Sequence, residues 1–147
     1  MAFEIEIEGL DKLQEAFEKS PEIVRKELEK TTKNAGMKIQ KTEVAEAPHK
    51  TGNLQRSIKW TYVPIVSKIV PMADYALPVH EGSKPHTILP VRARALYWKG
   101  APHPVMRVMH PGTKGNPFVA RTVQKVEKEV QRLFDDALKN VINELSK

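Results

Sequence analysis

The stretch that decides the fold is NPFVARTVQKVEKEVQRLFDDALKNVINEL, residues 116–145. Asn116 followed by Pro117 is typical of a helix start, because Asn is a favoured N-cap and proline suits the first helical position. The sequence therefore predicts a helix over about residues 117–145, roughly 40 Å long at about 1.5 Å per residue. Apolar residues recur in it at steps of three and four, on one face; they are Val119, Val123, Val126, Val130, Leu133, Ala137, Val141 and Leu145.

A second long helix is predicted over about residues 20–47. Ser20-Pro21-Glu22 has the same pattern of cap and proline, with an acid in the first turn, and Pro48 ends the helix. Upstream, the sequence predicts a strand and then a short separate helix. The strand alternates Phe3, Ile5 and Ile7 with glutamates up to Gly9, and the short helix carries Leu10, Leu13 and Phe17.

The middle of the chain predicts short strands and turns. Eight of the eleven prolines lie between residues 51 and 116, which excludes long helices there. We expect strands at 58–62, 65–70, 75–79, 95–98 and 105–108, and an exposed loop over Glu81–Pro90. The predicted fold class is α+β: one domain, residues 1–147, with an antiparallel meander sheet of short strands packed against the two long helices.

Charge is spread unevenly, although the net charge is +6. Residues 1–47 carry 8 Lys/Arg and 11 Asp/Glu, whereas residues 48–116 carry 10 and 2. An acidic start and a basic middle predict a dipolar subunit, which could meet a neighbour head to tail or turn its basic part toward a polyanion such as DNA. Basic solvated loops explain the middle segment equally well. Its basic residues Arg92, Arg94, Lys99, Arg107 and Lys114, with Tyr97 and Trp98 nearby, are of the types that contact phosphates and stack on bases. No helix-turn-helix, zinc-finger or aromatic strand motif accompanies them, so we expect any DNA contact to be nonspecific.

Composition and spacing argue against an enzyme. The chain has no cysteine, which excludes disulfides and thiolate chemistry and fits a reducing cytoplasm. No apolar stretch approaches the roughly 20 residues that span a bilayer, and the first residues do not resemble a signal peptide, so we expect no membrane contact. His80-Glu81 lacks a second histidine four residues on, and no serine lies in a Gly-x-Ser-x-Gly turn. We therefore predict no catalytic, cofactor-binding or metal-binding residues.

Three motifs, in order, resemble the gene-product-ten-like family of siphophage neck and tail-completion (head–tail joining) proteins. The first runs from Ala47-Pro48 through Thr51-Gly52-Asn53-Leu54 to Ser57-Ile58, the second is Tyr75-Ala76 with Val79 to Ser83, and the third is His110 to Thr113 with Asn116-Pro117-Phe118. The family often has an apolar residue after Ala-Pro, whereas this chain has His49 at that position. We interpret the motif residues as structural: Pro48, Thr51, Gly52, Leu54, Tyr75, Ala76, Gly82, Pro111, Gly112, Pro117 and Phe118. In that interpretation Thr51 caps a turn and Leu54 points inward.

The resemblance implies a virion protein of a long-tailed bacteriophage or prophage, made in the host bacterial cytoplasm. It implies a neck subunit that assembles into a ring and meets head-closure and tail-terminator or tail-tube proteins, with nonspecific contact to packaged DNA as a possible addition. The alternative is a nonspecific DNA-binding protein that uses the basic middle segment. For a loop that contacts a partner or DNA, the candidate residues are His80, Glu81, Lys84, His86, Arg92 and Arg94.

Overall fold

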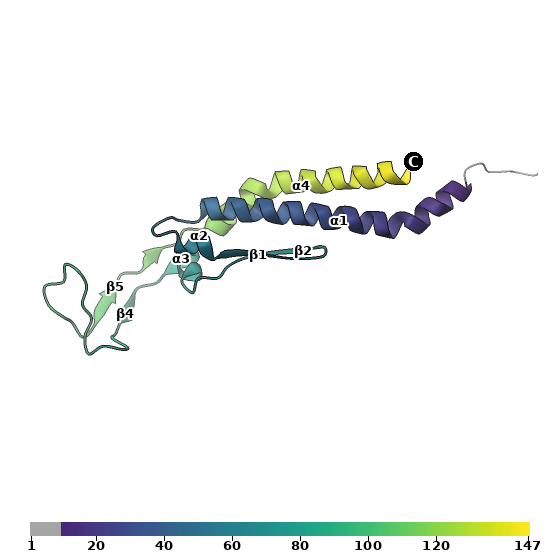
Figure 1. Ribbon diagram of the computed structural model, residues 1–147. Coiled ribbons are helices and arrows are strands. Elements are labelled where there is room, and N and C mark those ends of the chain that lie inside the picture. Colours follow the sequence, from purple (N-terminus) through teal and green to yellow (C-terminus); the bar gives the residue numbers. More distant parts are fainter. Residues whose placement is uncertain (1–9) are drawn as a thin grey trace, which may run out of the picture.

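The computed structural model describes residues 10–147, so the strand predicted over residues 3–8 lies outside the described part. Helices and strands are both present, and the α+β class is confirmed (Figure 1). The helices are α1 (Leu10–Glu46), α2 (Asn53–Ser57), α3 (Ala76–Glu81) and α4 (Phe118–Leu145). The strands are β1 (Ile58–Val63), β2 (Val66–Pro71), β3 (Gly82–Ser83), β4 (His86–Ile88), β5 (Val108–His110) and β6 (Thr113–Lys114).

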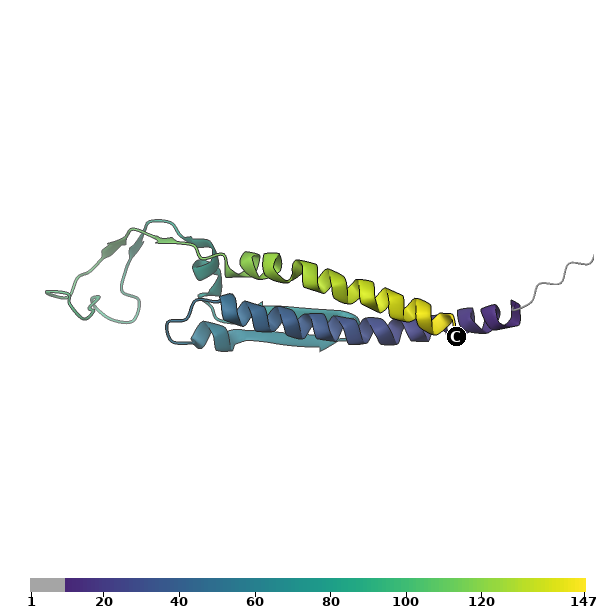
Figure 2. The same ribbon diagram turned by 90° about the horizontal axis from the view of Figure 1, so that it is seen from above.

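The two long helices lie side by side and run in opposite directions, forming a rod (Figures 1 and 2). Charged contacts join them at several levels: Arg121 donates to Glu46 at 3.0 Å and Lys38 pairs with Glu129 at 2.7 Å. Lys125 also donates to Glu46. The hydrogen bonds from Lys125 and then Arg121 lower the pKa of the Glu46 carboxyl. Most of the predicted apolar stripe of α4 is buried or half-buried, but Val123 is exposed.

Thr122, and not Val123 of the predicted apolar stripe, is the buried residue at this level of α4. It lies four residues after the fully buried Phe118 and four before Val126, on the same row of the helix. Its hydroxyl donates to the Phe118 carbonyl at 2.9 Å, so burial leaves no unsatisfied polar atom on it. A threonine paired in this way packs as an apolar residue of similar size would.

Helix α1 begins ten residues earlier than predicted, and the expected helix start at Ser20 is wrong. Pro21 lies inside one continuous helix of 37 residues. Proline removes one backbone hydrogen bond and crowds the preceding turn, which can bend a helix without ending it. The N-terminal part of α1 is bent relative to the rest (Figure 1).

The strands are antiparallel but pair as separate two-stranded ladders in the described part of the chain, not as one meander. The longest is the β1–β2 hairpin, which pairs Ile58 with Pro71 at one end and Val63 with Val66 at the other. It packs along α1, where the Tyr62 hydroxyl donates to the Glu29 carbonyl at 3.1 Å. The second ladder joins β3 to β6, and the third joins β4 to β5.

The strand expected over residues 75–79 is wrong, because this segment begins the short helix α3. Pro78 falls in its first turn, where a backbone N–H has no partner within the helix, so proline is tolerated there. The strands expected at 95–98 and 105–108 are largely absent: they form a single bridge between Leu96 and Val105, and only Val108 belongs to a strand, as the first residue of β5.

An arm projects from the end of the rod where α1 ends and α4 begins (Figures 1 and 2). We define the arm as residues 84–111; it contains β4, β5 and the long connection between them. Residues 84–89 of the loop predicted over Glu81–Pro90 are exposed, but the segment is not one loop, because it contains the end of α3 and the strands β3 and β4. The arm's connection carries exposed apolar side chains, with Val91 at 94% and Met106 at 68% exposure.

Candidate functional site

The three sequence motifs meet at one place, where the arm joins the rod. Buried residues from each motif form one apolar cluster, which we call the motif hub: Ala47, Leu54, Ile58, Ala76 and Phe118. Phe118 at 0% and Ile58 at 2% exposure are its most buried members. Because these residues come from three separate stretches of the chain, their common role is to hold the end of the helix pair, the hairpin and the base of the arm together.

The first motif turns the chain sharply after α1. Gly52 has a positive φ of 76°, which glycine adopts without steric cost, and it is the residue before α2. Thr51 does not cap this helix with its side chain, which corrects that expectation. Instead, Gln55 donates from its side-chain amide to the Val44 carbonyl at 2.9 Å and ties α2 to the end of α1. Leu54 is 4% exposed and points into the hub.

The second motif supplies both buried and exposed groups. Ala76 is buried, whereas Tyr75 is 46% exposed at the start of α3. The His80 ring lies edge-on to Phe118 with 5.6 Å between ring centroids. Its Nε2 atom is buried and has no hydrogen-bond partner in the described part of the chain. Two of the candidate contact residues lie on α3. Glu81 is exposed, whereas His80 packs in the hub region and not in an exposed loop.

The third motif returns the chain from the arm to α4. Gly112 has a φ of 85°, and an added Cβ would lie 2.2 Å from the Ser83 carbonyl oxygen, so Pro111-Gly112 is a turn that needs glycine. Pro117 occupies the N-cap position of α4, and no side chain caps this helix. The Asn116 cap expected from the sequence is therefore wrong. Its Oδ1 atom is buried without a partner among the described residues.

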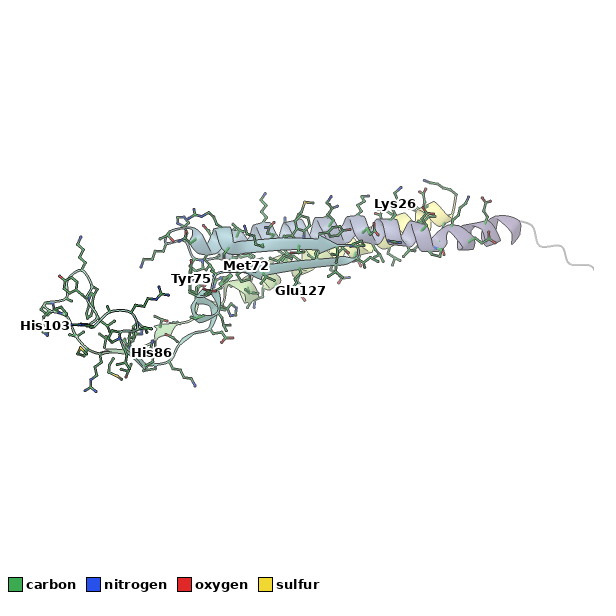
Figure 3. All side chains as sticks on the ribbon, turned by 60° about the horizontal axis from the view of Figure 1, so that its bottom comes forward. Lys26, Met72, Tyr75, His86, His103 and Glu127 are labelled. Carbon is green, nitrogen blue, oxygen red and sulfur yellow. The ribbon has the colours of Figure 1, made fainter. Side chains whose placement is uncertain are left out.

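An apolar groove of about 630 Å³, the hub groove, opens beside the motif hub. Residues of all three motifs line it, together with two basic residues, and no acid among the described residues does. Tyr75 forms part of its wall at the junction of rod and arm (Figure 3). Its lining residues are Pro48, Lys50, Thr51, Gly52, Asn53, Leu54, Tyr75, Pro78, Val79, Thr113, Lys114 and Asn116. This groove was not predicted from the sequence, because the motif residues that line it were interpreted as structural.

The other candidate contact residues lie in the arm. Lys84, His86, Arg92 and Arg94 are all exposed. Figure 3 shows His86 and His103 on the arm, on the opposite side of the Tyr75 junction from Lys26 on the rod, with His103 the farther of the two. No acid occurs between residues 82 and 126, so no acid on the arm itself neutralises these cations. None of the arm's cations forms an ion pair with another described residue.

The five histidines are not gathered into one site. His86 and His110 face each other across the β4–β5 ladder and stack with 5.1 Å between ring centroids. His86 Nδ1 contacts the Lys84 carbonyl at 2.8 Å, and the Gly112 N–H donates to His110 Nδ1 at 3.0 Å. Within residues 10–147, no group of three or more His, Asp or Glu side chains is placed to hold a metal ion. No described helix is long and apolar enough to span a membrane.

One buried carboxylate on α1 gives a testable prediction. Glu43 is 3% exposed, its Oε1 has no hydrogen-bond partner among the described residues, and burial raises its pKa. Because the pKa of Glu43 is higher in the folded than in the unfolded protein, the protonated carboxyl favours folding. This contribution is complete below the unfolded-state pKa and is lost as the pH rises through the folded-state pKa. We expect Glu43→Gln to increase the free energy of unfolding at pH 7 by about 1 kcal/mol.

Denaturant unfolding at pH 7 and pH 4 measures this effect, and the advantage of Glu43→Gln should shrink at pH 4 because Glu43 is then protonated. Glu22→Gln, at an exposed position of the same helix, is the matched control. A loss of stability in Glu43→Gln at pH 7 would show that the carboxylate has a partner that stabilises its charge.

The comparison with family models gives one match over residues 11–98, more than half of the chain. The matching model is described as "Bacteriophage HK97-gp10, putative tail-component". Its range includes α1, the hairpin, α3 and the first part of the arm. No curated protein and no solved structure matches the chain.

Proposed function

Because the chain belongs to the HK97-gp10-like family of bacteriophage tail components, we propose that it is a structural subunit of the head–tail junction of a long-tailed phage or prophage. In this role copies of the chain form a ring in the neck, between head-closure proteins and tail-terminator or tail-tube proteins. The match to a tail-component family is the observation that carries the proposal. It supports a role in the virion, in which the chain would act by assembly with other virion proteins.

The shape of the molecule supports assembly through repeated contacts. A rod with an arm at one end can offer different surfaces to different neighbours. When the same pair of unlike surfaces joins each copy to the next, the copies form a closed ring if the rotation between neighbours divides a full turn. Exposed apolar side chains gather on the arm, and others lie on α4, where Leu138 is 61% and Ile142 is 53% exposed. Apolar groups left exposed together in this way are typical of surfaces that a partner covers.

Deleting the gene from the phage tests the proposed position. We expect lysates with DNA-filled heads and complete tails that are not joined, seen by negative-stain electron microscopy. Expression of the chain from a plasmid should restore joined particles. Complete virions without the chain would contradict a joining role, and the absence of tails would place the chain in tail-tube assembly instead.

The arm's charge gives a narrower prediction. Lys84 and His86 are exposed at its base, and Lys84→Ser with His86→Ser should reduce the yield of joined particles, about tenfold if both side chains contact a partner. The fold should be retained, because exposed side chains contribute little to stability. Lys59→Ser, at an exposed position on β1, is the control. Unchanged phage yield in the double variant would argue against contact at this part of the arm.

Nonspecific DNA binding is the second candidate function, and one observation favours it. The arm carries five exposed cations and no acid, with Tyr97 68% and Trp98 50% exposed among them. Cations and exposed rings are the residue types that hold phosphates and stack on bases. Binding of the purified chain to DNA that falls steeply with salt would support this function. Binding absent at about 50 mM salt would exclude it.

A further inference from the structure

We propose that the hub groove receives the N-terminal segment of a neighbouring copy, residues Phe3–Glu8, and that this exchange links adjacent subunits. The inference deepens the proposed function and rests on it, because it names the contact from which the ring is built. Four observations support it: the chemistry of the groove, the sequence of the segment, the distance between them in one chain, and the charge of the other candidate occupants.

The groove is suited to an apolar strand with acidic side chains. Leu54, Pro78 and Val79 are among its apolar lining residues. Lys50 and Lys114 also line it; both are exposed, and neither is ion-paired with a described residue. A ligand that inserts apolar groups and places carboxylates near these two ammonium groups would match the groove in both respects.

The segment FEIEIE, residues 3–8, has this chemistry. Its three apolar side chains alternate with three glutamates, and it contains no cation. In an extended backbone, successive side chains point to opposite sides, so the apolar residues can face a groove while the glutamates face its rim or the solvent. No other run of this kind occurs in the chain.

A chain cannot fill its own groove. The segment precedes α1, whereas Pro48 and Lys50 of the groove follow the other end of that helix. A helix of 37 residues is about 55 Å long, and nine residues span at most about 30 Å. The occupant must therefore come from another copy. Each copy then donates at one end of its rod and receives at the other, which is a heterologous contact that can close into a ring.

The charges of the chain disfavour its other exposed segments as occupants. The arm of a second copy is apolar in part but carries only cations, so it would bring like charges to Lys50 and Lys114. The exposed face of α4 carries Lys128 and Arg132 as well as acids, and its backbone hydrogen bonds are already made within the helix. Of the N-terminal segment, the arm and the exposed face of α4, only the first combines apolar side chains with uniformly negative charge.

A labelled synthetic peptide of residues 1–9 tests the proposal by fluorescence anisotropy. The receiving protein is the full chain carrying Ile5→Asp and Ile7→Asp, so that its own segments do not compete. We expect saturable binding that weakens about tenfold or more in Lys50→Glu with Lys114→Glu. The matched control, Lys84→Glu with Lys99→Glu in the arm, changes net charge equally and should have little effect.

Three results of this titration would overturn the proposal. The first is a lack of saturable binding up to about 1 mM peptide, and the second is equal weakening of binding by the groove and arm variants. The third is equal binding of a peptide in which Phe3, Ile5 and Ile7 are replaced by serine. A peptide with its three glutamates changed to lysine should bind the groove variant and not the original groove. Circular dichroism of each variant shows that the helices are retained.

The assembled protein gives a second test, because the chain has no native cysteine. Copies with Ile5→Cys mixed with copies with Asn53→Cys, at the groove, should form a cross-linked heterodimer with a short bis-maleimide. Copies with Lys99→Cys, in the arm, should not. Equal cross-linking to both positions would contradict the exchange. If the peptide does not bind while gene deletion still leaves heads and tails unjoined, this inference fails and the proposed neck role stands.

Discussion

Phe118→Ala is expected to lower the free energy of unfolding by about 3–5 kcal/mol, the largest effect of any single side-chain truncation considered for this chain. Phe118 is 0% exposed and is the largest fully buried side chain among the described residues. It belongs to the motif hub with Ala47, which follows α1, and with residues of α2, β1 and α3, and its ring lies against that of His80. Its loss would leave a cavity that these separate segments cannot all close.

Guanidinium unfolding followed by circular dichroism measures this change. The matched control is Val123→Ala, five residues along α4 at 53% exposure, which should change stability by less than about 0.5 kcal/mol. Because a domain of this size is typically stable by about 5–15 kcal/mol, Phe118→Ala should still fold but unfold at much lower denaturant concentration. Equal effects of the two substitutions would mean that the hub is not the centre of the fold.

Gly36→Ala is expected to destabilise the protein by about 2–3 kcal/mol, although alanine is normally the better helix residue by about 1 kcal/mol. Gly36 lies on α1 under the hairpin. An added Cβ would lie 2.3 Å from Ser67 Oγ and 2.5 Å from Trp60 Nε1. Those two atoms hydrogen-bond to each other at 3.2 Å, and Ser67 also donates to the Thr32 carbonyl at 2.8 Å. The methyl group would therefore displace the hairpin and disrupt both bonds.

Thermal or denaturant unfolding shows whether Gly36→Ala lowers or raises the free energy of unfolding, and Trp60 fluorescence reports whether the hairpin has moved. Lys33→Ala, on the exposed face of the same helix, should be within about 0.5 kcal/mol of the original protein. Stabilisation by Gly36→Ala would show that the hairpin does not pack closely on α1.

The long helices could be predicted because periodicity and proline placement are local signals. Helix α4 begins within one residue of the predicted start, and Pro48 lies two residues beyond the end of α1. The same local logic failed at Pro21, because a proline can bend a helix without ending it. It also failed at residues 75–79, because a five-residue apolar run fits a short helix and a strand equally well.

The separate ladders and the groove could not be predicted, because they depend on how distant segments meet. Gly82, for example, is a turn residue in the sequence, but its added Cβ would lie 2.4 Å from the Thr113 carbonyl, 31 residues away. The groove beside it is formed by short stretches of three motifs. Each motif gives a local conformation, and only their convergence creates a surface that a partner can enter.

The structure of the neck in purified virions, determined by electron cryomicroscopy, is the most direct test of the proposed role. We expect a ring of copies at the head–tail joint, with the α1–α4 rods side by side and density from one copy in the hub groove of the next. A virion in which this chain is absent from the joint, or lies elsewhere in the tail, would rule out the proposed neck role.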